Sequence, residues 1–143
     1  MSKASPLLLD SHAWVWLMEG APGIPAAARI SIEQAANAGR LWVSAISVWE
    51  VAMLAAKGRV VFSTDVHAWV RQAFAAPGLH LAPLSPEIAV ASASLPGEFH
   101  GDPVDRILVA TARALTARLV TADRAILEYG RLGHISTLPL VVR

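Results

Sequence analysis

The sequence has no cysteine among its 143 residues. This absence excludes disulfide bonds, thiolate metal sites and cysteine nucleophiles, and it suits a reducing cytosol, so we expect a cytoplasmic protein. An excess of charge of one sign is missing as well, because 12 lysines and arginines nearly balance 11 aspartates and glutamates. The net charge of +1 supplies no general field that would attract nucleic acid. Any binding of nucleic acid must therefore depend on a local patch.

Long apolar segments are also absent. Asp10 and His12 interrupt the apolar start of the chain before a signal-peptide core can form. No other run approaches the ~20 apolar residues of a membrane span, so we expect a soluble protein with no membrane contact. The sequence contains no repeat, low-complexity tract or linker-like segment, and residues 1–143 are predicted to form a single domain.

Apolar side chains are abundant, since 55% of the residues are hydrophobic and only 16% are charged. This balance argues against disorder and leaves apolar surface for a partner, so we expect a homodimer or a heterocomplex. Five tryptophans dominate the aromatic content. Trp14 and Trp16 cannot both face the same way on one helix, so one of them is a candidate anchor in a partner groove.

Short apolar segments alternate with segments of helical pattern along the chain. Strands are expected at residues 6–9, 41–43, 79–84, 118–122 and 135–142. Helices are expected at residues 11–19, 26–38, 44–57, 64–76, 85–95 and 102–117, with a short one from Arg124. Pro139 would confine the last strand to an edge of the sheet. The alternation indicates an α/β domain with a mainly parallel central sheet.

Five acidic residues fall where such a sheet would place a binding site. Asp10 directly follows the first strand, Asp123 follows the fourth, and Glu50 lies two turns into the helix after the second. Asp102 and Asp105 begin the helix at 102–117. Ligands of open parallel sheets bind outside the carboxyl ends of the strands, so we expect these side chains to meet at one edge.

Each of these residues also has a purely structural interpretation. Asp102 before Pro103 fits a helix N-cap, and Asp10 and Asp123 can cap helices in the same way. Glu50 can simply be solvated on an amphipathic helix. Asp105 lies about 100° from Val104 around the helix, at the border of the buried stripe, where a carboxylate can face a cleft.

The functional interpretation comes from the five residues together. Two like charges 4 Å apart repel by about 1 kcal/mol in water and about 4 kcal/mol at an effective dielectric of 20. The cluster therefore needs protonation, neutralisation by Arg106 or Lys57, or a divalent cation. We favour Mg²⁺ or Mn²⁺, which prefer carboxylate oxygens, because no histidine or cysteine set has the spacing of a zinc site. Such a site suits phosphodiester hydrolysis.

Other polar side chains near the cluster are candidates for supporting roles. His12 and His100 are candidates for contact with the substrate or for proton transfer. Hydroxyl groups could orient the carboxylates, and the candidates are Ser11, Ser44, Ser47, Thr111 and Thr121. No phosphate-binding glycine motif occurs, so a nucleotide cofactor is not expected.

Four stretches of this sequence resemble the PIN-domain nucleases, and most closely the VapC toxin ribonucleases of type II toxin–antitoxin systems. They are "LLLDSHAWVWL" (7–17), "VSAISVWEVAMLAAKGRV" (43–60), "HGDPVDRILVATA" (100–112) and "LVTADRAILEYG" (119–130). The resemblance implies a three-layer α/β/α fold, cleavage of RNA with Mg²⁺ or Mn²⁺, and inhibition by a VapB-type antitoxin.

Carried over by position, the family's catalytic, metal-binding acids would be Asp10, Glu50, Asp105 and Asp123, with Asp102 as an additional metal ligand. The sequence departs from the family at Val104, where many relatives have phenylalanine, and at His12, where many have serine, threonine or asparagine. Arg106 is a candidate partner for a carboxylate or a phosphate. Candidates for an RNA-facing surface are Arg113, Arg118 and Arg124.

Four other functions compete with an RNA-cleaving toxin. A phosphatase of the haloacid-dehalogenase type would need a second aspartate where the chain has His12, and a receiver-like module would need a lysine late in the chain, whereas Lys57 is the last. A non-catalytic PIN-like protein-binding module stays open. A DNA-cleaving or structure-specific PIN nuclease stays open too, although the chain lacks the extra helical and basic segments of such enzymes.

Overall fold

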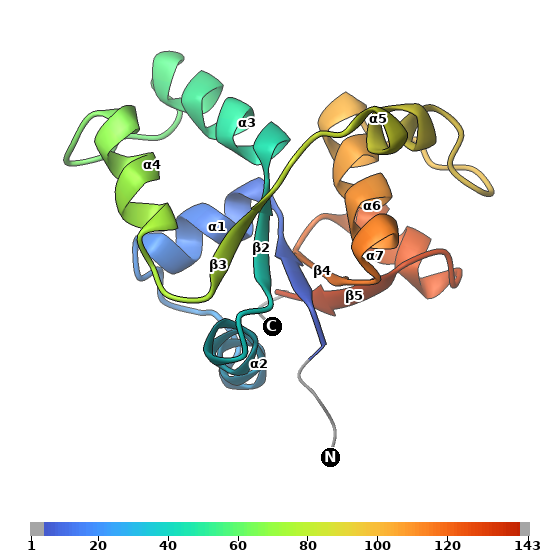
Figure 1. The fold of residues 1–143 in the computed structure, drawn as a ribbon, viewed down its shortest axis with the longest axis horizontal. Helices are drawn as coiled ribbons and strands as arrows, with labels where there is room; N and C mark the ends of the chain where they lie inside the picture. Colours follow the sequence, from blue (N-terminus) through green and yellow to red (C-terminus); the bar gives the residue numbers. More distant parts are fainter. Residues whose placement is uncertain (1–4, 141–143) are drawn as a thin grey trace.

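The computed structural model describes residues 5–140, and these form one five-stranded sheet with helices on both sides (Figure 1). The strands are β1 (Leu7–Leu9), β2 (Leu41–Ser44), β3 (Leu79–Ala82), β4 (Arg118–Thr121) and β5 (Ser136–Pro139). They lie in the order β3-β2-β1-β4-β5, and every neighbouring pair is parallel. The predicted parallel α/β architecture is confirmed. Pro139 lies on the edge strand β5, as its missing N–H requires.

Seven helices accompany the sheet within the described residues. They are α1 (Ser11–Met18), α2 (Ala26–Asn37), α3 (Ala45–Ala56), α4 (Val66–Phe74), α5 (Pro86–Ala93), α6 (Pro103–Leu115) and α7 (Arg124–Arg131). The helix predicted at 102–117 ends two residues early because Thr116 takes a left-handed conformation, with φ +50°, and closes it. The third strand ends at Ala82 rather than at residue 84, and residues 141 and 142 of the fifth lie outside the described part.

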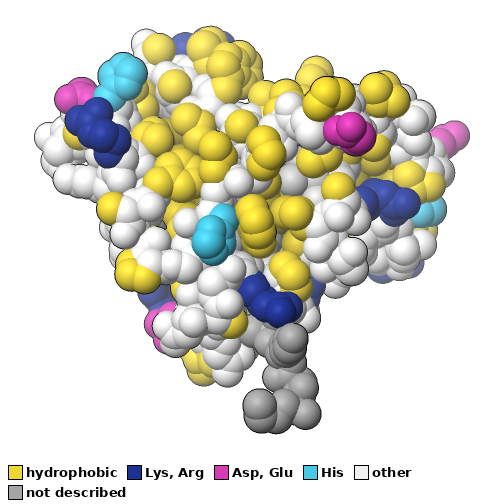
Figure 2. Space-filling view, in the orientation of Figure 1, with side chains coloured by type: hydrophobic (Ala, Val, Ile, Leu, Met, Phe, Trp, Pro, Cys, Tyr) yellow, Lys and Arg dark blue, Asp and Glu magenta, His cyan; other side chains and the backbone are white. Residues whose placement is uncertain are grey.

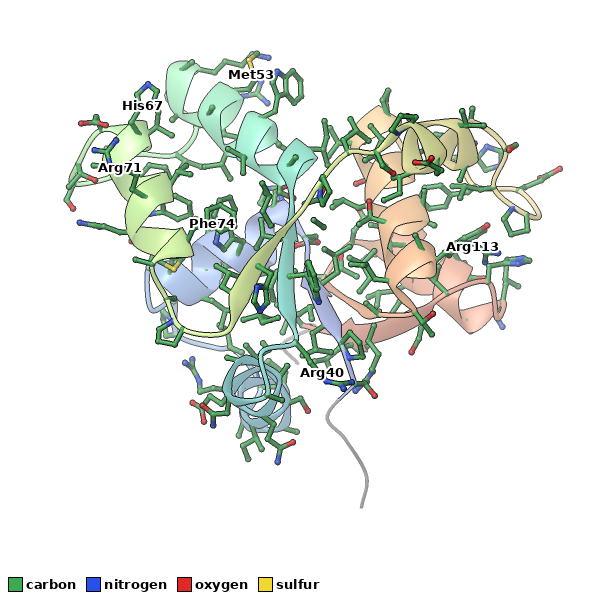
Figure 3. The ribbon with its side chains drawn as sticks, in the orientation of Figure 1. Arg40, Met53, His67, Arg71, Phe74 and Arg113 are labelled. Carbon is green, nitrogen blue, oxygen red and sulfur yellow. The ribbon has the colours of Figure 1, made fainter. Side chains whose placement is uncertain are left out.

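Alternation along the strands divides the core into two layers. Leu7 and Leu9 point to one face and pack with Trp14 and other side chains of α1, α2, α3 and α4. Leu8 points to the opposite face and packs with Leu108 of α6 and Ile126 of α7. Successive side chains of a strand point to opposite faces, so both faces of the sheet are covered and the fold is the expected three-layer α/β/α arrangement. Figure 3 shows Phe74 pointing inward from α4, where its ring lies 5.5 Å from that of Trp14.

Side-chain caps fix where the helices begin. Six of the seven described helices start after a residue whose side chain accepts a hydrogen bond from the first turn, and these caps are Asp10, Ser44, Asp65, Ser85, Asp102 and Asp123. Asp10 directly follows β1, Ser44 is the last residue of β2, and Asp123 lies two residues after β4. These three caps therefore lead from β1, β2 and β4 into α1, α3 and α7. The capping interpretation of Asp10, Asp102 and Asp123 is therefore confirmed.

Apolar side chains also reach the surface. Figure 2 shows hydrophobic side chains gathered over the middle of one face, with most charges toward its border. The exposed ones include Trp49, Leu81, Leu84 and Val90. No helix within residues 5–140 has the length and apolar character needed to cross a membrane.

Candidate active site

Asp10 is held at the carboxyl end of β1 by contacts on both sides. Its backbone N–H donates to Val120 O of the neighbouring strand β4 at 3.1 Å, and its carboxylate accepts from Ala13 N at 2.7 Å. The Thr121 hydroxyl donates to the same carboxylate. Burial raises the pKa of Asp10 although these hydrogen bonds lower it. Asp10 is therefore fixed in place and largely removed from water, with 7% of its surface exposed.

Asp105 lies in the first turn of α6, and the charges of all the other acids of the predicted site affect its pKa. Burial, followed by the charges of Asp102, Asp123, Glu50 and Asp10 in that order, raises its pKa to about 7. These four residues come from the end of β1, from α3 and from the starts of α6 and α7. The fold thus brings the five acidic residues, which are far apart in sequence, into one electrostatic cluster at the carboxyl edge of the sheet.

Within residues 5–140, the ion pairs that the structure shows, His100–Glu98 and Arg131–Glu128, do not involve a cluster residue. Arg106 does not pair with a carboxylate here, because its guanidinium donates to Ser92 O at 2.9 Å and to Phe99 O at 2.8 Å. Arg106 instead ties the end of α5 and the following loop to the start of α6. Its pairing with a phosphate stays a prediction.

The cluster has the oxygen donors that a hard divalent cation prefers, and its unneutralised charge fits such an ion. The side chains do not already form a closed metal site. Among residues 5–140, no three acidic, histidine or cysteine side chains are placed to hold an ion as they stand. The donor chemistry therefore fits Mg²⁺ or Mn²⁺, and binding would require the side chains to converge further.

Comparison with known proteins agrees with this geometry. The family model described as "PIN domain" matches residues 7–132. The chain is also 37% identical over 118 residues to Ribonuclease VapC22 of Mycobacterium tuberculosis, which covers 82% of this chain and 87% of that relative. The chain belongs to the PIN-domain family.

Solved structures of other proteins share the fold of this chain. One is the complex VapBC2 from Rickettsia felis bound to a promoter DNA fragment, with a TM-score of 0.67, 16% identity and coverage of 93% of this chain and 97% of that one. Another is a toxin–antitoxin complex from Klebsiella pneumoniae, with a TM-score of 0.59, 23% identity and coverage of 92% and 96%. At these identities the likeness shows the fold alone.

The hydroxyl groups of this PIN domain divide between the cluster and the scaffold. Thr121 contacts Asp10 directly and also accepts from Asp123 N at 3.0 Å, so it connects two of the acids. Ser11 and Ser47 are buried and bond to each other at 3.0 Å, which joins α1 to α3 behind the cluster. Ser44 and Thr111 serve local backbone instead, because Ser44 caps Ile46 and Thr111 donates to Ile107 O within its own helix.

The two candidate histidines differ in position. His12 is exposed beside Asp10, where its charge lowers the pKa of that carboxylate, and its ring lies 6.1 Å from that of Trp16. His100 is exposed in the loop before α6, 3.7 Å from Glu98, and contacts none of the five acids through an ion pair. His12 therefore adjoins Asp10, and a substrate role for His100, two residues before Asp102, stays a prediction.

Two of the candidate RNA-facing arginines are bound to backbone elsewhere. Arg118 begins β4, at the opposite end of that strand from Asp123, and donates to Thr137 O at 3.2 Å. Arg113, in the last turn of α6 (Figure 3), donates to His134 O. Arg124 directly follows Asp123 and is exposed, so it alone of the three adjoins the acids.

A groove of about 530 Å³ adjoins the cluster between α3 and α6. Glu50 and Asp102 line it together with Trp49 and Met53, and the cations Lys57 and Arg59 also line it. Figure 3 shows Met53 on the outer side of α3. Sequence reasoning missed Trp49, which is 53% exposed, because its position one residue before Glu50 becomes meaningful only when α6 packs alongside.

Proposed function

We propose that this chain, as a single domain of residues 1–143, is a Mg²⁺- or Mn²⁺-dependent endoribonuclease and the toxin of a type II toxin–antitoxin pair. The observation that supports this most is the burial of Asp105 among four other carboxylates, since burial and these charges together raise its pKa to about 7. Acids that repel one another, and that make no ion pair with a lysine or arginine within residues 5–140, are arranged for binding rather than for stability. The 37% identity to a ribonuclease favours RNA as the substrate.

The proposed ligands of the metal are Asp10, Glu50, Asp105 and Asp123, with Asp102 as an additional one that also caps α6. A bound Mg²⁺ or Mn²⁺ would offset phosphate charge and activate water, which is the chemistry that phosphodiester hydrolysis requires. The chain contributes fixed orientation, because Ala13 and Thr121 hold the Asp10 carboxylate. The proposed role of His12, which is exposed beside Asp10, is contact with the substrate or proton transfer.

The proposed antitoxin partner is of the VapB type. Structural relatives of this fold include VapBC complexes, which supports such a partner. We assign it to the groove between α3 and α6, where an apolar peptide would cover Trp49 and Met53 and a basic side chain would reach Glu50 and Asp102. A homodimer and a cytoplasmic location stay predictions.

The test is cleavage of a labelled single-stranded RNA by the purified protein with Mg²⁺ or Mn²⁺, compared with excess chelator. Asp10→Asn and Asp105→Asn should each lower the rate by at least about 100-fold, since each removes a charged ligand. Glu33→Gln on α2, an exposed acid outside the cluster, is the matched control and should cleave normally. Equal cleavage with chelator and in both variants would refute the proposal.

A further inference from the structure

A second cavity, of about 370 Å³, is lined in part by Ala122, the residue directly before Asp123 of the acidic cluster. Its lining comes from α1, from the segment that follows α1, and from the carboxyl ends of β4 and β5, namely Trp16, Ala21, Pro22, Gly23, Ile24, Ala122 and Leu140. None of these side chains is charged. Trp16 is half-buried, so its ring is both supported by the core and open to the cavity.

Two connections join this cavity to the acidic cluster. Ala122 lies between Thr121, which holds Asp10, and Asp123 of the cluster. On the other side, His12 and Trp16 are four residues apart and so share a face of α1, with their rings 6.1 Å apart. His12 is exposed two residues after Asp10. A nucleotide next to a phosphate held at the acids would therefore lie within reach of the cavity.

From this juxtaposition we infer that the cavity is a subsite for one unpaired nucleobase of the RNA, stacked on Trp16 next to the cleaved phosphate. The inference rests on the proposed function. A nucleobase is a flat ring with apolar faces, which an uncharged cavity with an indole wall accepts, and the charge of its phosphate stays outside at the cluster. A base inside a helix is stacked on both faces and cannot enter, so the subsite selects single-stranded or looped RNA.

A peptide segment of the antitoxin is the competing occupant. The other groove suits a peptide better, because it is larger, is lined by apolar side chains of two helices and carries both acids and cations. The Trp16 cavity has no charged side chain in its lining, and its lining residue Ala122 directly precedes Asp123 of the cluster. These differences favour the nucleobase.

The experiment measures kcat/KM for cleavage of a labelled, unstructured 20-nucleotide RNA with Mn²⁺ by the full chain and its variants. Trp16→Ala should lower kcat/KM by roughly 5- to 150-fold, the range expected for loss of one base–aromatic stack. Trp16→Phe should restore most of it, because an aromatic face remains. Ile30→Ala, which removes an exposed apolar side chain of α2 outside both grooves, is the control and should change it less than about threefold.

A second arm removes the base instead of the indole. Once the cleaved bond is mapped, an abasic nucleotide is placed on each side of it in turn, and one of the two should reproduce the Trp16→Ala loss with the unaltered protein. The losses in kcat/KM caused by the abasic substrate and by Trp16→Ala should not be additive, because each removes the same base–indole stack. This arm also decides the question if Trp16→Ala proves not to fold.

The outcomes separate this inference from the proposed function. If the unaltered protein cleaves no RNA with Mn²⁺, the proposed function is wrong, and the inference of a nucleobase subsite is wrong as well. If it cleaves and neither Trp16→Ala nor either abasic substrate lowers kcat/KM, the subsite alone is refuted. If Trp16→Ala leaves cleavage unchanged and weakens binding of an antitoxin peptide, the cavity belongs to the partner.

Discussion

Replacing Asp105 by asparagine should make the metal-free protein more stable while destroying its activity. Burial and four neighbouring carboxylates raise the pKa of Asp105 from 3.8 to about 7. Between these two pH values the folded protein binds more protons than the unfolded chain, so the stability contributed by this group falls as the pH rises and levels off above about 7. An asparagine side chain at this position carries no charge at any of these pH values, so the variant does not lose this stability as the pH rises.

The size of the effect follows from the same shift. Each pKa unit corresponds to 1.36 kcal/mol, so the whole shift would be about 4 kcal/mol. Asp105 is only partly buried and solvent screens its interactions, so we expect roughly 1–2 kcal/mol. Asp105→Asn should therefore unfold with a free energy roughly 1–2 kcal/mol higher than the unaltered protein at pH 8, and with nearly the same free energy at pH 4.

Urea denaturation at both pH values, in the presence of chelator, measures this difference. The control is Asp65→Asn at the exposed start of α4, where the Ala68 N–H lowers the pKa of the carboxylate. Its stabilisation is present at high pH and lost on acidification, so its pH dependence has the opposite sign. An Asp105→Asn variant that is no more stable at pH 8, or equally more stable at both pH values, would refute the reasoning.

Three further predictions concern the scaffold of the site. Gly101→Ala should lower RNA cleavage and reduce the free energy of unfolding by about 1–3 kcal/mol, because a Cβ there would meet the Phe99 ring and lie 2.9 Å from Asp105 Cβ. Measurements of kcat and of the urea midpoint check this. Arg106→Gln should lower the free energy of unfolding by about 1.5–3 kcal/mol, because it removes two hydrogen bonds to backbone carbonyls. Urea denaturation measures this, and an unchanged free energy would contradict the role of Arg106 in joining α5 to α6. Trp69→Ala should lower the free energy of unfolding by about 3–5 kcal/mol in the same measurement, since the Trp69 ring centroid lies 4.8 Å from that of Trp14 and 4.5 Å from that of Phe62. A decrease below about 1 kcal/mol would contradict this packing.

Much of the fold was predictable because its signals are local. Capping side chains and prolines mark helix starts such as those after Ser85 and Asp102, and short apolar runs mark the strands. The edge position of β5 followed from Pro139. The end of α6 was not predictable, because Thr116 takes a left-handed conformation without glycine to signal it.

The grouping of the acids was also predictable, since it follows from the rule that parallel strands end at one edge. The roles of the groups around them were not. Arg106 looked like a charge partner, but its carbonyl acceptors, Ser92 and Phe99, become available only when α5 packs on α6. The Trp16 cavity was equally hidden, since its walls come from three distant parts of the chain.

The central claim is that acids from distant parts of the chain jointly bind one or more divalent cations. Isothermal titration of Mn²⁺ into the metal-free protein tests it most directly, with Asp10→Asn titrated in parallel. The account predicts binding by the unaltered protein at or below millimolar concentration, and at least about tenfold weaker binding by the variant. No heat of binding at millimolar Mn²⁺, or equal affinity in both proteins, would contradict it.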